Sequence, residues 1–144
     1  MSDAGGYVVS DRPDHLDVPL IARWLRDESY WAAGVSEDVV RRAIANSLCF
    51  GAYRDGAQVG FLRVVTDRAT FAWLCDVFVI AEHRGNGVSK LMMDAVMAHP
   101  DLQALRSFLL ATRDAHGLYA RYGFEVIEGQ QRYMRILRPY RANP

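Results

Sequence analysis

The stretch DVFVIAEHRGNGVSK, residues 76–90, decides the fold, because it joins a buried strand to a helix through a loop with two glycines. Branched and aromatic residues predict a strand over 70–80. Gly85 and Gly87 interrupt that pattern, and apolar residues then recur at helical spacing over 91–96. The first N–H groups of a helix have no partner within it, and the helix dipole adds positive charge there. The stretch therefore predicts an anion site at the start of a helix.

The loop has the features that a phosphate site needs. Gly85 and Gly87 let the backbone approach a phosphate closely, and Arg84 and Lys90 supply positive charge nearby. A simple strand-to-helix turn with two glycines is the alternative interpretation. The sequence lacks both the P-loop pattern and the dinucleotide-binding pattern, so neither of these phosphate loops is expected.

The rest of the chain predicts one mixed α/β domain, residues 1–144, without linkers or repeats. Tight turns at residues 55–56 and 67–68 join the three central strands. Gly123 follows the last predicted helix, where a left-handed conformation ends helices. The pattern predicts a helix over 14–27, one that begins at a cap at Ser36, one that ends at Pro100 and one over 115–122. It predicts strands over 7–9, 49–54, 59–66, 70–80 and 107–112, and a final hairpin of 124–127 with 133–137.

Composition limits the possible functions. The chain has 144 residues, with 17 basic and 17 acidic side chains. This balance argues against a nucleic-acid binder that acts through bulk positive charge and against a polybasic membrane anchor. No apolar run approaches the roughly 18 residues of a membrane span, and the N-terminus lacks the features of a signal peptide.

The two cysteines have neither metal-ligand nor redox spacing. Cys49 and Cys75 both lie within apolar runs, which predicts free buried thiols. A cytoplasmic location follows from this, and no metal site is expected.

Two motifs carry a resemblance to a known family. Residues 84–89, RGNGVS, resemble the [Gln/Arg]-x-x-Gly-x-[Gly/Ala] signature of the GNAT superfamily of acetyl-coenzyme-A-dependent N-acetyltransferases. Ser89 departs from the pattern by replacing Gly or Ala. Residues 118–124, LYARYGF, are similar to the family's [Leu/Phe]-Tyr-x-x-x-Gly-Phe block. The predicted element order agrees with the GNAT fold, so the resemblance covers nearly the whole chain.

The resemblance implies a fold and an activity. The expected fold is α/β (α+β), with a central mixed, mostly antiparallel twisted sheet flanked by about four helices. The expected activity is transfer of an acetyl group from acetyl-CoA to a primary amine, favoured on a small molecule, by direct attack in a ternary complex. Protein lysines or N-terminal amines are alternative acceptors. A homodimer is compatible with the family, but no sequence feature defines its interface.

The rival hypotheses belong to other classes of protein. A non-catalytic acyl-CoA-binding sensor or interaction module would keep the same fold. An α/β interaction domain with an accidental motif match would not bind acetyl-CoA at all. Coenzyme A release with an amine would separate the enzyme from both.

The resemblance also implies a set of cofactor-binding residues. In the family the loop amides hold the pyrophosphate of acetyl-CoA, and the preceding strand pairs with its pantetheine arm and polarises the acetyl carbonyl. A position near the following strand often carries an asparagine that orients the cofactor. In this sequence these positions are Val77, Phe78, Val79, Arg84, Gly85, Asn86, Gly87, Val88, Ser89, Lys90 and Thr112.

Two residues are candidates for the chemistry. Tyr119 matches the family's tyrosine that gives a proton to the leaving thiolate, although a packed helical tyrosine is the alternative. Asp76 lies within an apolar strand, where a carboxylate is costly to bury without a partner. It either binds and helps to deprotonate the amine or forms a structural pair with a base such as Arg63. Cys75 replaces the second acid of polyamine-type members, which argues against a polyamine acceptor.

The acceptor site is expected to involve residues outside the motifs. Tyr30 and Trp31 fall in the segment that, by resemblance, forms one wall of that site, and aromatic rings there could enclose an apolar or cationic group. Core packing explains them equally well. Arg63, Asp67 and Arg68 lie on or beside the central hairpin and could recognise an acidic acceptor.

Overall fold

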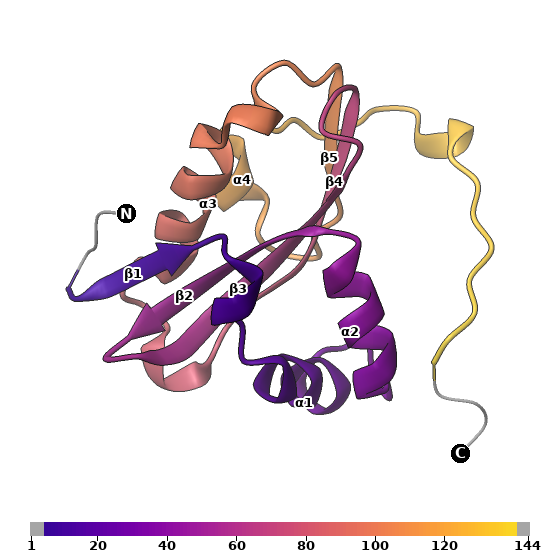
Figure 1. The fold of residues 1–144 in the computed structure, drawn as a ribbon. Helices are drawn as coiled ribbons and strands as arrows, with labels where there is room; N and C mark the ends of the chain where they lie inside the picture. Colours follow the sequence, from indigo (N-terminus) through magenta and orange to yellow (C-terminus); the bar gives the residue numbers. More distant parts are fainter. Residues whose placement is uncertain (1–4, 141–144) are drawn as a thin grey trace.

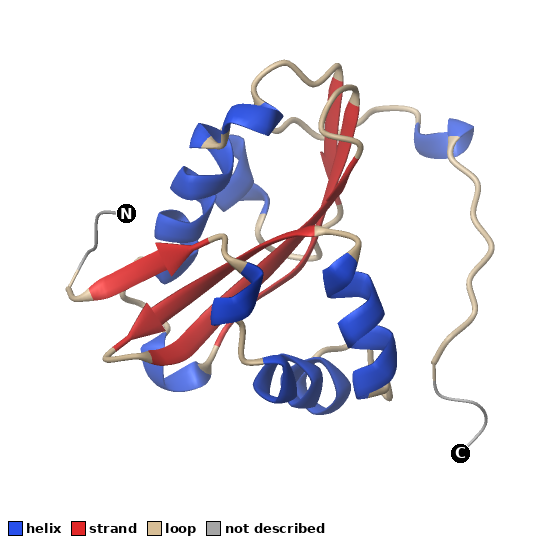
Figure 2. Ribbon diagram, in the orientation of Figure 1, coloured by secondary structure: helices blue, strands red, loops and turns tan. Residues whose placement is uncertain are grey.

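The computed structural model describes residues 5–140, which form a five-stranded sheet with helices on both faces (Figures 1 and 2). This agrees with the mixed sheet and the four helices that the sequence predicts. In chain order the elements are β1 (Tyr7–Ser10), the 3-10 helix η1 (Pro13–His15), α1 (Val18–Glu28), α2 (Glu37–Ala45), β2 (Leu48–Arg54), β3 (Ala57–Thr66), β4 (Phe71–Val79), η2 (Ala81–His83), α3 (Val88–Ala98), η3 (Pro100–Leu102), β5 (Ser107–Leu110), α4 (His116–Ala120) and η4 (Gln130–Arg132).

The sheet follows the order of the chain. Strands β1 to β4 pair as antiparallel neighbours, and β5 adds to β4 in parallel. Asp55 and Gly56 both have positive φ, 51° and 82°, as a two-residue hairpin turn between β2 and β3 requires. The predicted turn at these residues is therefore confirmed.

The sheet is buried on both faces. Phe61 and Leu62 are adjacent on β3, so their side chains point to opposite sides, and neither is exposed to solvent. Phe61 packs with Ile21 and Leu25 of α1, whereas Leu62 packs with Met92 of α3. Figure 2 shows the same division, with α1 and α2 on one face and α3 and α4 on the other.

The first two helices start where side chains can cap them. The expected helix over 14–27 divides instead into η1 and α1, because Asp17 accepts a hydrogen bond from the Leu20 N–H at 3.2 Å and Pro19 occupies the first turn. Ser36 caps α2 as expected, with its hydroxyl oxygen accepting from the Val39 N–H.

The predicted final hairpin is wrong. Residues 124–127 and 133–137 form no strand, and η4 lies between them. Their apolar residues have the pattern of strands, but a strand is stable only against a partner. The structure leaves 133–140 exposed along the right of Figure 1.

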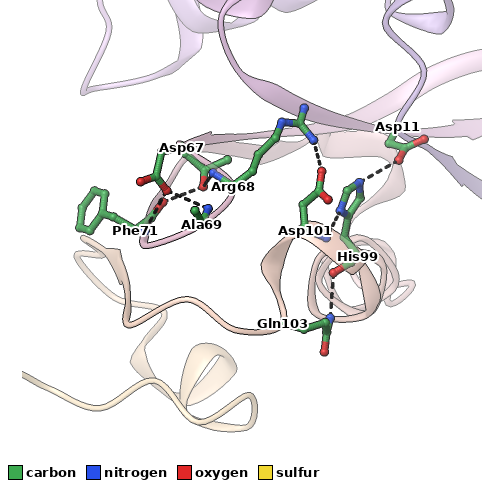
Figure 3. A network of polar contacts seen from close by, with 9 residues as sticks. Asp11, Asp67, Arg68, Ala69, Phe71, His99, Asp101 and Gln103 are labelled. Atoms are coloured by element: carbon green, nitrogen blue, oxygen red, sulfur yellow. Dashed lines mark hydrogen bonds and ion pairs between the residues drawn. The ribbon is translucent and has the colours of Figure 1, made fainter.

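The β3–β4 turn is held by its own polar groups, as Figure 3 shows. Hydrogen bonds from Thr70 and from backbone N–H groups of the turn hold the pKa of Asp67 well below its usual value. Arg68 forms an ion pair with Asp101. These contacts occupy Asp67 and Arg68 in the turn, and neither lines the cleft described next.

Candidate active site

A cleft opens where β4 and β5 separate. Their pairing ends at Leu74 and Leu110, while β4 continues to Val79 (Figure 1). The cavity beside this point measures about 820 Å³ and is lined by β3, β4, the α1–α2 loop, α2, the segment that follows β5, Tyr119 of α4 and three residues of the C-terminal segment, Arg135, Leu137 and Tyr140. Within residues 5–140, the edge of β4 beyond Leu74 has no strand partner on the β5 side.

An irregularity in β4 lies within the cleft. The pairing of β3 with β4 shifts between Phe61 and Arg63, so Leu62 faces the Asp76–Val77 step. Asp76 has a φ of 56°, a left-handed conformation that Asp adopts more readily than most residues. Bulges of this kind redirect a side chain out of the regular alternation.

Asp76 holds two side chains at once. Its Oδ2 accepts a hydrogen bond from Arg63 Nε at 2.8 Å, and its Oδ1 accepts one from Trp31 Nε1 at 2.8 Å. The side chains of Arg63 and Asp76 are only 20% and 11% exposed, and Arg63 also donates to the Ser47 hydroxyl. Burial lowers the pKa of Arg63, but the charge of Asp76, its hydrogen bond and smaller contributions from Cys75 and Cys49 together outweigh burial, so the pKa is raised. The pairing of Asp76 with Arg63, which the sequence left open as one of two alternatives, is therefore present, and it lies in the cleft.

Tyr119 forms part of the cleft wall. It lies on α4, is 8% exposed and packs edge-on against Phe124. Burial raises the pKa of its hydroxyl, which keeps the proton on the oxygen at neutral pH. Thr112 lines the same cavity, and its hydroxyl oxygen accepts a hydrogen bond from the Ala115 N–H at the start of α4.

The glycine loop forms the N-terminus of α3. Gly85 and Gly87 have φ values of 79° and 78°, and apart from their own chain neighbours no atom of the described chain lies within 4 Å of where a side chain on either would begin. Gly87 is the N-cap residue of α3 and makes no side-chain hydrogen bond to the first N–H groups of the helix. Arg84 donates through Nε to the Val79 carbonyl at 2.9 Å and ties the loop to the end of β4.

The other predicted loop residues have different surroundings. Asn86 donates to the carbonyls of His83 and Arg84, which shapes the turn. Val88 is buried in the core, Ser89 is half-buried, and Lys90 is exposed and pairs with Asp94 one turn along the helix. Val88 and Ser89 therefore offer mainly backbone N–H groups, while Lys90 offers charge.

The strand residues predicted to contact the cofactor are mostly covered by the fold. Phe78 and Val79 are buried and pair with β3, and Phe78 stacks on Trp24 with ring centres 4.2 Å apart. Val77 lines the cavity. Phe78 and Val79 do not line it, and on the β5 side no strand within residues 5–140 pairs with this part of β4.

The aromatic wall includes a residue that sequence reasoning missed. Tyr30 and Trp31 both line the cavity, and their rings lie 5.0 Å apart. Arg113, from the segment after β5, places its guanidinium over the Tyr30 ring at 4.0 Å. This contact joins the α1–α2 loop to the segment after β5 across the cleft. Its position directly after Thr112 was the only signal in the sequence.

The cysteines are free and lie on either side of Arg63. Cys49 and Cys75 are its cross-strand neighbours on β2 and β4. Strand β3 lies between these cysteines, and two inter-strand spacings place them about 9.6 Å apart, which is too far for a disulfide. Burial raises the pKa of each thiol to about 12, so both stay protonated at neutral pH.

Two further features are absent from residues 5–140. No group of three or more His, Cys, Asp or Glu side chains in this range is arranged to hold a metal ion. No helix there has both the length and the apolar character needed to cross a bilayer. His83 lies outside the cleft, where its Nδ1 hydrogen-bonds the Tyr7 hydroxyl at 2.8 Å.

A family comparison identifies this architecture. The family described as the acetyltransferase (GNAT) domain matches residues 45–126, more than half of the chain. The chain belongs to the GNAT superfamily. The match includes the glycine loop and Tyr119, and membership supports an acetyltransferase function.

Similar proteins agree with the GNAT assignment. A candidate acetyltransferase of Gibberella zeae is 33% identical over 135 residues, covering 78% of this chain and 75% of that protein. The crystal structure of a GNAT-family protein from Xanthomonas campestris pv. campestris is 55% identical, with a TM-score of 0.89 over 93% of this chain and 94% of that one.

A more distant structure was determined with acetyl-CoA. A candidate acetyltransferase of Clostridium acetobutylicum, crystallised with acetyl-CoA, has a TM-score of 0.60 and 14% identity, covering 91% of this chain and 94% of that one. At this identity the likeness shows the shared fold alone.

Proposed function

We propose that this protein transfers the acetyl group of acetyl-CoA to a primary amine of a small molecule. The observation that carries the proposal is the strand edge of β4 beyond Leu74, which leads from the cleft beside Tyr119 to the glycine loop before α3. The cleft volume of about 820 Å³ lies within the range of small-molecule sites, roughly 300–1,000 Å³.

The glycine loop has the chemistry to hold a pyrophosphate. The first N–H groups of α3 are free of side-chain caps, and the space beside Gly85 and Gly87 is open. Arg84 and Lys90 add positive charge at this end. We expect the backbone of 85–90 to bind the phosphates and the edge of Val77–Val79 to align the pantetheine arm. Thr112 stands where the strands separate and is expected to contact the same arm.

The transfer requires a proton donor and a place for the amine. The amine nitrogen bonds to the acetyl carbon and loses a proton, while the carbon–sulfur bond breaks and the thiolate takes up a proton. The Tyr119 hydroxyl has an ordinary pKa of 10.0, which burial raises further, so it is protonated at neutral pH, and it is the group assigned to the thiolate.

We assign binding of the acceptor amine to Asp76 and the side chains around it. Each carboxylate oxygen accepts one hydrogen bond from the protein and retains a lone pair that can accept another from the amine. Tyr30 and Trp31 would enclose the substrate, and Arg63 would hold the carboxylate in place. Asp76 thereby binds the ammonium form and draws its proton, directly or through water.

The experiment replaces Tyr119 with Phe and measures coenzyme A release with a panel of primary amines. The expected kcat of the variant is about 100-fold lower, as the loss of a general acid predicts, with unchanged acetyl-CoA affinity. Tyr53→Phe is the control, because the Tyr53 hydroxyl is buried without a hydrogen-bond partner among the described residues. Full kcat in Tyr119→Phe would contradict the role of Tyr119. Acetyl-CoA binding without release, for every amine, would instead indicate a binding module.

A further inference from the structure

Arg113 brings a positive charge to the cleft that no described acid neutralises. Its guanidinium carbon lies 4.0 Å from the centre of the Tyr30 ring, which holds the group at the cleft. Attraction to a ring does not use up the five N–H donors of a guanidinium. Within residues 5–140, no carboxylate forms an ion pair with Arg113. Its donors are therefore available to an anionic ligand.

The basic residues that the sequence offered for an acidic acceptor are already engaged. Arg63 is paired with Asp76. Arg68 forms its ion pair at the β3–β4 turn, outside the cleft. Arg135 lines the cleft from the C-terminal segment, but it is exposed and has neither an ion pair nor a ring contact to a described residue that would fix its position. Arg113 is thus the cleft arginine that is both fixed in place and free of an acid.

The charges along the cleft are unequal. The lining contains three arginines and two aspartates, namely Arg63, Arg113, Arg135, Asp76 and Asp114. Asp114 is exposed and forms no ion pair with a base of the described chain. The cleft therefore has an excess of positive charge, which favours an acceptor that carries an anionic group.

The aromatic wall places this charge close to Asp76. The Tyr30 ring beside Arg113 lies 5.0 Å from the Trp31 ring, and Trp31 Nε1 donates to Asp76 Oδ1 at 2.8 Å. Three contacts in sequence thus connect the guanidinium to the carboxylate, a span that a small molecule can bridge. The α1–α2 loop and α2 add an apolar surface to the cleft: Ala32, Val35, Val39, Val40 and Ile44.

We propose that the acceptor is an amine that also carries a carboxylate, with its ammonium at Asp76 and its carboxylate at the N–H edge of Arg113. This inference rests on the acetyl transfer proposed above and names its class of acceptor. A planar guanidinium can donate two parallel N–H groups to a carboxylate, which fixes the orientation of the molecule. The body of the acceptor lies against the apolar wall. Arg113 selects the acceptor and takes no part in the proton transfers.

The test measures binding without turnover, by calorimetric titration in the presence of coenzyme A, which has no acetyl group to transfer. The probes are L-phenylalanine with its amide and ε-aminocaproate with its amide, two pairs whose members differ in the carboxylate. In wild type the acid of at least one pair is expected to bind about tenfold more tightly than its amide, as the loss of a charge-assisted hydrogen bond predicts.

The decisive variant is Arg113→Gln, which is expected to bind acid and amide equally and to keep its affinity for coenzyme A. Comparison with this variant removes differences between acid and amide that do not involve Arg113. Arg42→Gln is the control, because Arg42 is exposed on α2 and does not line the cleft. This control is expected to retain the full preference for the acid.

Several results would overturn the inference. Equal binding of acid and amide in wild type is one, and absence of binding by all four compounds is another. A preference that survives in Arg113→Gln, including one lost only in Arg135→Gln, would also contradict it. A loss of coenzyme A affinity in Arg113→Gln would assign the residue to the cosubstrate instead. The predicted preference without coenzyme A release from acetyl-CoA would support the carboxylate site and contradict the proposed transfer.

Discussion

The two ends of the cleft beside β4 are built from different parts of the chain. At the α3 end the available groups are backbone N–H groups and open space around Gly85 and Gly87. At the other end they are side chains, and the pair of Arg63 with Asp76 is held by Trp31 and Ser47. The α3 end depends on backbone conformation, and the Asp76 end depends on the identity of its side chains.

This difference explains what each end can recognise. A backbone site accepts the same phosphate group in any chain that forms the loop, so it needs few particular side chains. A side-chain site changes whenever one residue changes. We therefore infer that the α3 end serves the shared cosubstrate and that the Asp76 end defines the acceptor.

The largest effect is expected for Asp76→Asn. Asparagine tolerates the left-handed backbone of this position, so the change removes the charge and leaves Arg63 buried without an anionic partner. We expect the free energy of unfolding to fall by about 3 kcal/mol in urea denaturation. We also expect the KM for the acceptor to rise, with acetyl-CoA affinity unchanged.

The matched control for this change is Asp14→Asn. Asp14 pairs with Arg12, but both side chains are about two-thirds exposed, at 67% and 66%. Solvent screens such pairs, so no measurable loss of stability is expected. Equal losses in the free energy of unfolding for Asp76→Asn and Asp14→Asn would contradict the claim that the buried pair contributes more stability than the exposed pair.

A smaller effect is expected at the backbone end from Gly87→Ala. The left-handed φ of Gly87 disfavours any side chain by about 1–2 kcal/mol, although no described atom would clash with it. Relaxation of the loop would misalign its N–H groups, and acetyl-CoA affinity is expected to fall about tenfold by calorimetric titration.

Gly56→Ala is the control that distinguishes backbone strain from a loss of acetyl-CoA binding. Gly56 has a φ of 82° and equally open surroundings, but it lies in the β2–β3 turn. The two variants are expected to lose similar stability, and only Gly87→Ala should lose affinity. A parallel loss of affinity in both would remove the basis for assigning the phosphates to the loop.

The sequence predicted the backbone end better than the side-chain end. The two glycines identified the loop, and the helical spacing of the apolar residues after them identified the helix, because both patterns reflect local backbone conformation. The sequence left open whether Asp76 pairs with Arg63, since the pairing depends on a shift in the register of β3 and β4. Arg113 was missed because only the meeting of two loops brings it to Tyr30. The prediction of the final hairpin was wrong because a strand-like sequence pattern does not indicate which strand the segment would pair with.

The last effect appears only at alkaline pH and concerns the thiols beside Arg63. Burial raises the pKa of Cys49 and Cys75 from the ordinary value of 9.0 to about 12. Above pH 9 an unfolded chain loses these protons while the folded chain keeps them, so stability is full below pH 9 and falls as the pH rises towards 12. Each thiol is expected to contribute a slope of about 1.4 kcal/mol per pH unit. Urea denaturation between pH 7 and pH 10.5 should give a shallower slope for Cys49→Ala; an unchanged slope would contradict the burial effect.

The most direct test of the account is a thermal-shift titration of the wild-type protein with acetyl-CoA, coenzyme A and a longer acyl-CoA. A ligand that binds the folded state raises the melting temperature in a saturable way. The account predicts such a rise with acetyl-CoA, a similar rise in Gly56→Ala and a much smaller one in Gly87→Ala. No rise with any of the three ligands at saturating concentration would contradict the assignment of this cleft to acetyl-CoA.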